Sequence, residues 1–291
     1  MLPIYDIGIF GGDKRQVYMA LALLSKGYTV ATYRTHTKVI HENCTELSSL
    51  RELFEGAKVL IGPIPMSKDK TTINASSVAE DLSLDNIIQL LSKEHLLFGG
   101  VIPSNIIKAC ESEGIYYYDL MKDERITILN AIATAEGTIM EAIAASERNL
   151  HASKCLVLGY GRCAKVLAAK LKALDAHVLV AARSEDALAH AEAMGLSVVT
   201  LPYIKCVLPS CDYIFNTIPS LILTPDCLEY VNKQACIIDI ASAPGGLDYD
   251  YAKQLQINAK LCLSLPGKVA PKTSADILVT TIHSLIKERS D

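Results

Sequence analysis

The sequence lacks the features that mark several classes of protein. Its net charge is −4 at pH 7 and it has no block of basic residues, which argues against a nucleic-acid or anionic-membrane partner. The first residues, MLPIYDIGIF, have no basic n-region, so we expect a first strand and no signal peptide. No apolar run reaches membrane-spanning length, because the longest candidate, residues 126–145, contains Asn130, Glu136 and Glu141.

Metal-binding patterns are also missing. The nine cysteines include no C-x-x-C pair and the seven histidines include no H-E-x-x-H motif, so we predict no metal. Cys155, Cys236 and Cys262 lie within apolar stretches, which is typical of reduced, buried thiols. We therefore expect a cytoplasmic protein.

Motifs of common hydrolases and kinases are not found either. There is no nucleophile elbow and no kinase signature. Gly267-Lys268 superficially resembles a P-loop, but Val269 stands where Ser or Thr is needed and Cys262 stands where the first glycine is needed. A Walker-type nucleotide site is therefore excluded.

One stretch, KCLVLGYGRCAKVLAAKLKAL, carries the main signal. Residues 155–158 predict a buried strand, and residues 165–174 have the apolar spacing of a helix. A strand, a G-x-G-x-x-A turn and a helix form the dinucleotide-binding fingerprint. Gly159 allows the tight turn, Gly161 lets the backbone approach a pyrophosphate, and Ala164 lets the helix pack closely. We expect the cofactor at Gly159, Tyr160, Gly161, Arg162, Cys163 and Ala164.

The choice between NAD and NADP depends on the next strand, residues 177–182. NAD-selective folds place an acidic residue after this strand, about 20 residues beyond the glycines. Here Arg183 and Ser184 follow it, and a guanidinium with a hydroxyl suits a 2′-phosphate, so we predict NADP. In the alternative, Arg183 is only solvated and Ser184 only caps the following helix. Glu185 would select NAD if the strand ends later.

Further cofactor contacts are expected where later strands of this unit end. The carboxyl ends of parallel strands form the ligand-binding edge of an open sheet. The turn after residues 213–217 is as typical of an ordinary turn as of a cofactor contact. The residues predicted to line the cofactor at this edge are Thr217, Ile218, Pro219, Ile240 and Pro266.

Strands alternate with helices over most of the chain, which predicts an α/β fold with two doubly wound parallel-sheet domains. The first domain, which we expect to bind the substrate, is expected at residues 1–125 and is of flavodoxin-like or half-Rossmann type. The second, at residues 126–291, is expected to be a Rossmann domain that binds NADP.

Two long helical patterns are expected to connect these domains. Residues 130–149 have apolar side chains at three- and four-residue steps and are the natural interdomain helix. Residues 273–288 predict a C-terminal helix that returns to the first domain, with Thr273 and Asp276 as a loose capping box.

Charged residues at loop ends or helix starts are the candidates for chemistry. They are Asp13, Arg15, Glu136 and Lys272. Each residue alone is more typical of a structural ion pair than of a catalyst.

Several motifs, in the right order, together resemble one family, the A subunit of dipicolinate synthase. They are GGDKRQ at residues 11–16, EGTIM at 136–140, LGYGR at 158–162, ARS at 182–184, NTIPS at 216–220 and LPGKVAPKT at 265–273. Two positions depart from the family pattern. Asp175 replaces a glycine that commonly ends the first Rossmann helix, which is tolerable because Asp can take a left-handed conformation. Ala243 replaces a basic residue of some relatives.

This resemblance implies oxidation of dihydrodipicolinate, or of its hydroxylated precursor, to dipicolinate with NADP. It also implies a sporulating bacterium, the mother-cell cytoplasm and, as partner, the flavoprotein-like B subunit of dipicolinate synthase. The substrate would be a small cyclic dicarboxylate, with Arg15 and Lys272 holding the carboxylates and Glu136, or a water held by it, taking the proton. A homodimer is a further expectation.

Two other functions stay open. The chain could be a nucleotide-binding regulatory or scaffold subunit whose chemistry needs the B subunit. It could also be a 2-hydroxy-acid or shikimate-type dehydrogenase, although the His-Glu or Lys-Asp pair of such enzymes is not recognisable.

Overall fold

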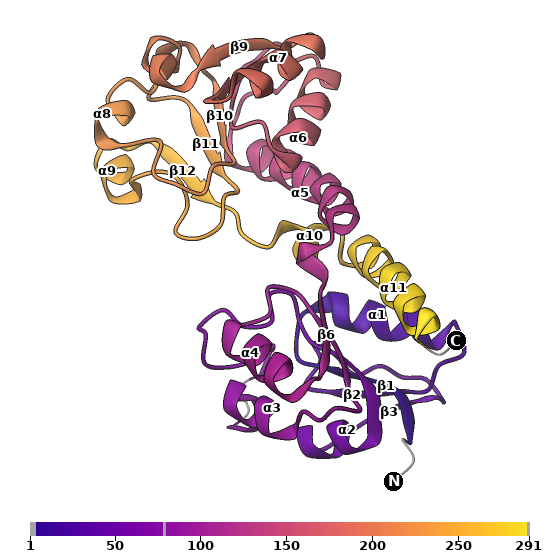
Figure 1. The fold of residues 1–291 in the computed structure, drawn as a ribbon. Helices are drawn as coiled ribbons and strands as arrows, with labels where there is room; N and C mark the ends of the chain where they lie inside the picture. The colour runs from indigo at the N-terminus through magenta and orange to yellow at the C-terminus, as the bar shows by residue number, and fades with distance from the viewer. Residues whose placement is uncertain (1–3, 78–79, 290–291) are drawn as a thin grey trace. The chain divides into compact units, whose positions relative to one another are not determined.

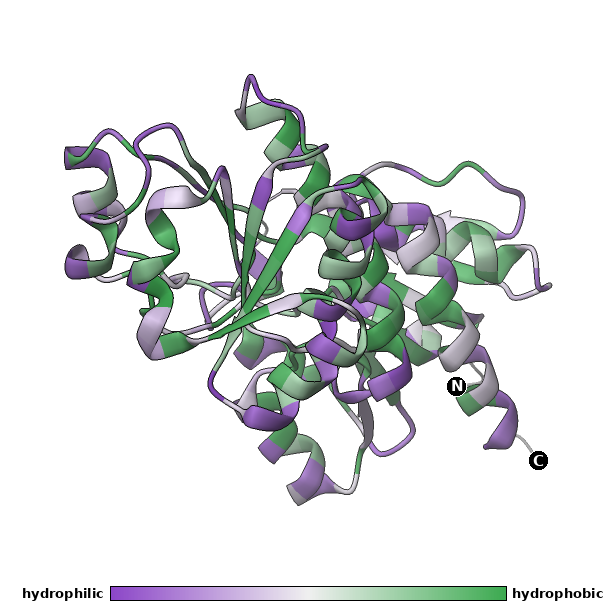
Figure 2. Ribbon diagram, turned by 90° about the horizontal axis from the view of Figure 1, so that it is seen from above, coloured by the Kyte–Doolittle hydropathy of each residue, from purple (hydrophilic) through white to green (hydrophobic). Residues whose placement is uncertain are grey.

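The computed structural model describes residues 4–77 and 80–289, and it has the predicted α/β class (Figure 1). The chain forms two compact units. Unit 1 contains the chain up to residue 127 together with residues from 270 onward, and unit 2 contains residues 128–269. Each unit has a six-stranded sheet in which every pairing is parallel. Figure 2 shows hydrophobic residues along the strands, as expected of sheets covered on both faces.

The sheet of unit 1 has the order β3-β2-β1-β4-β5-β6. This is the Rossmann order and not the 2-1-3-4-5 order of flavodoxin, so the flavodoxin-like prediction for this domain is wrong. Helices cover both of its faces, with α1 and α11 on one side and α2, α3 and α4 on the other. Its strands are β1 (Tyr5–Phe10), β2 (Val30–Tyr33), β3 (Cys44–Glu46), β4 (Ala57–Ile61), β5 (Leu96–Gly99) and β6 (Tyr116–Asp119). Its helices are α1 (Lys14–Leu24), α2 (Leu50–Gly56), α3 (Leu84–Leu90), α4 (Ser104–Glu113) and α11 (Pro271–Glu288).

Helix α11 packs on α1 although the two are at opposite ends of the sequence. Leu278 and Ile282 are fully buried in the same hydrophobic cluster as Met19 and Leu23. The predicted capping box is wrong, because α11 begins at Pro271 and its N-cap has no side-chain hydrogen bond. Proline is common at the first helical position, because its missing N–H would have had no partner there and its fixed φ suits a helix.

The sheet of unit 2 has the order β12-β11-β10-β7-β8-β9. Strand order therefore reverses between β7 and β10, and this switch point is where open α/β sheets bind ligands. The strands are β7 (Lys154–Leu158), β8 (His177–Ala182), β9 (Ser197–Thr200), β10 (Tyr213–Asn216), β11 (Cys236–Asp239) and β12 (Asn258–Leu261). The helices are α6 (Arg162–Ala173), α7 (Glu185–Ala193), α8 (Pro225–Leu228), α9 (Tyr249–Gln254) and α10 (Leu265–Val269). Asp175, after α6, has φ +58, so the prediction that it takes a left-handed conformation is confirmed.

Helix α5 (Glu124–Ala145) runs across the division between the units, so the predicted bounds of 130–149 are wrong at both ends. Within the described ranges it is the one helix long and apolar enough to span a membrane, by length and composition only. Its Ala135 and Ala142 are fully buried in the core of unit 2.

Candidate functional site

The glycine turn between β7 and α6 has the geometry of a dinucleotide site. Gly159 has φ +94, and a Cβ there would lie 2.5 Å from Thr217 Oγ1, so both the backbone and the space require glycine. Gly161 is the N-cap of α6 and has no side-chain cap. A Cβ on Gly161 would meet no protein atom within 4 Å in the part of the chain that the structure describes. The turn therefore leaves open space at a helix N-terminus, where backbone N–H groups and the helix dipole favour a phosphate.

The other residues of the fingerprint differ in what they offer. Ala164 is fully buried, which matches its predicted role in packing α6 against the sheet. The Tyr160 ring is buried with Lys165 Nζ 5.7 Å from its centroid, so this residue has mainly its backbone to offer a ligand. Arg162 is exposed and Cys163 is partly buried. Burial raises the pKa of the Cys163 thiol, which disfavours the thiolate.

The two residues predicted to select NADP over NAD, Arg183 and Ser184, directly follow β8. Arg183 is exposed, and its side chain has no hydrogen bond or ion pair with any residue that the structure describes. Ser184 is the N-cap of α7, and its Oγ accepts from Ala187 N at 3.4 Å. Ser184 therefore caps α7, and the exposed Arg183 agrees both with a solvated side chain and with one that binds a ligand. Glu185 is the first residue of α7 and not the end of the strand.

The turn after β10 is tied to the glycine turn. Thr217 Oγ1 donates to Leu158 O at 2.8 Å, directly before Gly159. The side-chain amide of Asn216 closes the turn by accepting from Ile218 N and donating to Ile218 O, each at 3.1 Å. Thr217 and Ile218 therefore form a fixed wall beside the glycine turn.

A buried carboxylate ends the neighbouring strand, β11. Asp239 is fully buried, and its oxygens accept from Asn216 Nδ2, Ala241 N, Gly246 N and Tyr249 Oη at 2.9, 2.9, 2.6 and 2.8 Å. Burial, followed by the hydrogen bond to Asp239, raises the pKa of Tyr249 and keeps its hydroxyl a donor. Ile240, one of the predicted cofactor contacts, directly follows this anchor. Asp239 was not among the predicted site residues, although an acidic residue that ends the apolar strand CIID was a signal present in the sequence.

Pro266 lies in α10, which packs against α5 within unit 2. A Cβ on Gly137 of α5 would lie 2.9 Å from Val269 Cγ2 and 3.2 Å from Leu265 Cβ, so glycine permits this close approach. Lys272 is the second residue of α11, so the predicted start of the last helix at residue 273 is two residues late.

Arg15 is held by a carboxylate two residues away. Its Nε and Nη2 donate to Asp13 Oδ1 and Oδ2 at 2.9 and 2.8 Å, and Nη2 also donates to Ile64 O. Burial alone would raise the pKa of Asp13, but hydrogen bonds and charge from Arg15 hold it below its usual value. Arg15 is 5% exposed. No residue in the described ranges accepts a hydrogen bond from its Nη1, so this nitrogen keeps donors for a ligand.

The other two predicted catalytic residues form ion pairs at the surface. Lys272 Nζ lies 2.8 Å from Asp276 Oδ2, and this contact raises the pKa of the lysine. Glu136 Oε1 lies 2.9 Å from Lys170 Nζ of α6. Lys272 belongs to unit 1 with Arg15, and Glu136 belongs to unit 2. In residues 4–77 and 80–289, no three His, Cys, Asp or Glu side chains form a group that could hold a metal ion.

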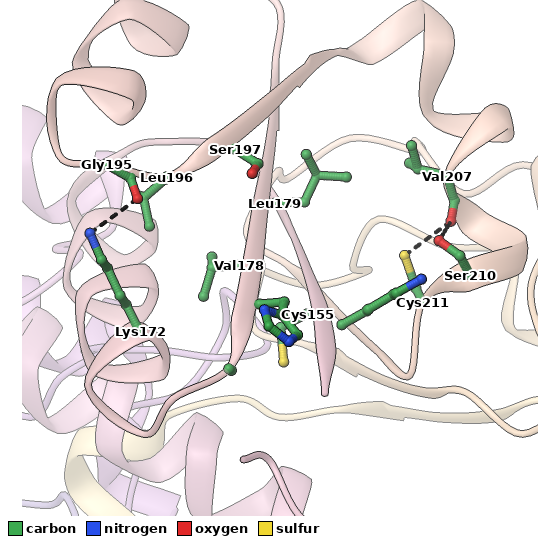
Figure 3. A pocket seen from close by; sticks show the side chains of 13 residues that line it. Cys155, Lys172, Val178, Leu179, Gly195, Leu196, Ser197, Val207, Ser210 and Cys211 are labelled. Atoms are coloured by element: carbon green, nitrogen blue, oxygen red, sulfur yellow. Dashed lines mark hydrogen bonds between the residues drawn. The ribbon is translucent and has the colours of Figure 1, made fainter. Parts of the chain in front are cut away.

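A cavity of about 420 Å³ lies at the opposite edge of the unit 2 sheet (Figure 3). It is lined by Lys154 and His177, the first residues of β7 and β8, and by Lys172, whose Nζ donates to Gly195 O at 3.0 Å. Ligands in open α/β sheets bind at the carboxyl ends of the strands. This cavity, at the amino ends, is therefore not the dinucleotide site.

Comparison with known proteins identifies the family. Residues 6–121 match the family described as the N-terminal domain of the dipicolinate synthase A subunit, and residues 125–243 match the D-isomer specific 2-hydroxyacid dehydrogenase, NAD binding domain. The chain is 31% identical to the A subunit of dipicolinate synthase from Bacillus subtilis (strain 168), over 99% of this chain and 98% of that protein. The chain belongs to the family of dipicolinate synthase A subunits.

Solved structures agree with this relationship. The crystal structure of the dipicolinate synthase A subunit from Bacillus halodurans matches with a TM-score of 0.88 and 29% identity, over 98% of each chain. A transhydrogenase from Sinorhizobium meliloti matches with a TM-score of 0.64 and 13% identity, over 96% of this chain and 94% of that chain, which shows a shared fold alone. The family and the NAD-binding domain make this chain a dehydrogenase-type oxidoreductase that uses a nicotinamide dinucleotide.

Proposed function

We propose that this chain oxidises dihydrodipicolinate, or its hydroxylated precursor, to dipicolinate with NADP as oxidant. Membership of the family of dipicolinate synthase A subunits supports the substrate class. The main observation in favour of a bound dinucleotide is the open helix N-terminus beside Gly161. It lies next to strand β8, which is followed by the exposed Arg183. A guanidinium that can pair with phosphate oxygens favours NADP over NAD.

The oxidation removes a hydride and a proton from dihydrodipicolinate and leaves the ring aromatic. The hydroxylated precursor would first have to lose water to reach the same oxidation step. Aromatisation provides the driving force, so the protein has mainly to orient the ring and exclude water. The dinucleotide, when bound, accepts the hydride. Glu136, or a water that it holds, is the proposed acceptor of the proton.

The two carboxylates of the substrate require fixed positive charge. Arg15 is suited to this role because Asp13 and Ile64 O hold its Nε and Nη2, which leaves Nη1 to donate to the substrate. A guanidinium held in this way loses little side-chain entropy when it binds a carboxylate. Lys272 is the proposed second cation, and it would exchange its exposed contact with Asp276 for the substrate.

The proposed setting follows from the family. The chain would work with the B subunit of dipicolinate synthase in the cytoplasm of the mother cell of a sporulating bacterium, and it would form a homodimer. The relationship to a protein whose name marks it as the A subunit supports the existence of a second, different subunit.

The decisive experiment measures dipicolinate formation from freshly generated precursor, with NADP or NAD, in the presence and absence of the B subunit. We expect product and reduced dinucleotide in equal amounts, with faster turnover for NADP. If dipicolinate forms only when the B subunit is present, an active site built from both subunits would be favoured. Dinucleotide binding without turnover under any condition would instead indicate a regulatory or scaffold role.

A further inference from the structure

The carboxylate of Asp239 joins two turns that are separate in the sequence. Oδ1 accepts from Asn216 Nδ2 and Ala241 N, and Oδ2 accepts from Gly246 N and Tyr249 Oη. All four partners are neutral donors, and together they use the acceptor positions of an ionised carboxylate. Buried charge is retained only where it is hydrogen-bonded in this way.

The first of the two turns follows β10. Because the Asn216 amide that donates to Asp239 also binds both backbone groups of Ile218, the carboxylate fixes the orientation of that amide and, through it, the turn. A Cβ on Gly159 would lie 3.0 Å from Ile218 Cγ1, so this turn also borders the glycine turn. Movement of Asp239 would therefore change the wall of the dinucleotide site.

The second turn, residues 240–246, follows β11. Its two ends are held by Asp239, through Ala241 N and Gly246 N. Gly246 approaches the first turn closely, since a Cβ there would lie 2.3 Å from Asn216 Nδ2 and 2.8 Å from Ile218 O. The two turns thus form one hydrogen-bonded block at the carboxyl ends of β10 and β11.

The topology indicates which half of a dinucleotide this block would meet. A Rossmann sheet consists of two mononucleotide-binding halves, and the half with the glycine turn and the ribose-binding residue takes the adenosine. In this chain that half is β7-β8-β9, with Gly159, Gly161 and Arg183. Strands β10, β11 and β12 form the other half, which takes the nicotinamide mononucleotide.

We infer that Asp239 is a positioning residue for the nicotinamide half of the cofactor, acting through the turns after β10 and β11. This inference rests on the proposed use of a nicotinamide dinucleotide. Removal of the carboxylate should leave adenosine binding intact and free the nicotinamide ring to move.

The test uses the full-length chain and two ligands, NADPH and 2′-phospho-ADP-ribose, which lacks nicotinamide. Asp239→Asn keeps the side-chain shape but replaces one acceptor oxygen by a donor. Tyr249→Phe removes one donor and leaves the carboxylate. The matched control is Asp119→Asn in unit 1, which alters another buried carboxylate. Asp119 accepts from three backbone N–H groups, those of Val101, Ile102 and Met121.

We expect Asp239→Asn to keep its affinity for 2′-phospho-ADP-ribose within about twofold. The fluorescence anisotropy of the bound reduced nicotinamide should fall by about half or more. Tyr249→Phe should give a smaller fall in the same direction, and Asp119→Asn should give none. If Asp239→Asn does not fold, Tyr249→Phe decides the question.

Wild-type anisotropy in both variants of unit 2 would overturn the inference. Equal loss of both ligands would also overturn it, because Asp239 would then support the whole site. A wild-type chain that binds neither ligand would contradict the proposed function itself, which separates the two failures.

Discussion

Arg15 and Asp13 form a two-point contact, with Nε 2.9 Å from Oδ1 and Nη2 2.8 Å from Oδ2. Asp13 also accepts from Arg15 N as the N-cap of α1. The start of the helix and the orientation of the guanidinium are therefore set by the same carboxylate. A substrate carboxylate at Nη1 would meet an arginine whose direction is already fixed.

Arg15→Met should lower kcat/KM for the dicarboxylate by about tenfold or more, because the fixed cation is lost. Dinucleotide affinity should be unchanged. Combination with Asp13→Asn removes the half-buried negative charge that the loss of Arg15 leaves unpaired. Arg51→Met, which breaks an exposed pair with Glu55, is the matched control. Steady-state kinetics with near-normal turnover in the Arg15 variant would show that the arginine only stabilises the helix start.

Lys272→Met should also lower kcat/KM by about tenfold while NADP affinity is retained. The surface contact with Asp276 contributes little to stability, so the melting temperature should change little. Calorimetric titration with NADP distinguishes the two roles available to this lysine. Loss of NADP binding would assign Lys272 to the cofactor.

Arg183→Asp should weaken NADP binding by about 2 kcal/mol or more, since a phosphate partner is replaced by a like charge. NAD has no 2′-phosphate and should bind with nearly unchanged affinity. Titration of both cofactors tests this, and an equal loss for both would mean that Arg183 does not select between them.

Gly161→Val should fold normally but lose the dinucleotide. A Cβ at this position meets no described protein atom within 4 Å, so the new side chain would occupy only the space expected for the pyrophosphate. Gly159→Val is the informative contrast, because its φ of +94 and the nearby Thr217 should make that variant unstable. Thermal melts with and without NADP compare the two. Unchanged binding by the Gly161 variant would contradict the assignment of this turn.

Stability should rise with pH below about 6.5, in part through His95. Burial lowers the pKa of this imidazole, whose Nδ1 accepts from Ser92 N at 3.0 Å. Because the folded state disfavours protonation, the unfolded state binds more protons as the pH falls, and stability is lost there. Urea unfolding between pH 5.5 and 7.5, a range around the ordinary histidine pKa of about 6.5, gives the free energy of unfolding at each pH. We expect this free energy to change less steeply with pH in His95→Gln than in the wild type.

The fold class was predictable because each unit repeats an apolar run, a turn and an amphipathic helix. The features that were not predicted depend on contacts between residues that are far apart in the sequence. Strand β3 (Cys44–Glu46) is a short, polar edge strand that exists through its pairing with β2. Helix α5 begins early because Asp123 Oδ1 accepts from Ile126 N at 3.0 Å. Helix α5 ends at Ala145, whose carbonyl oxygen accepts a hydrogen bond from Asn258 Nδ2 of β12 at 2.6 Å.

The candidate site divides in the same way. The glycine turn is encoded within a few consecutive residues, so its residues and their conformation could be inferred. The network around Asp239 joins Asn216, Gly246 and Tyr249, and only the folded sheet brings them together. No local pattern separates such an aspartate from one that merely ends a strand.

The position of α11 in unit 1 has a consequence for how the chain matures. Until residues 271–288 have been synthesised, the face of α1 that carries Met19 and Leu23 is not covered by α11. Unit 2, by contrast, is contained within residues 128–269. During translation the later unit can therefore complete its core before the earlier one, reversing the usual N-to-C order of domain folding.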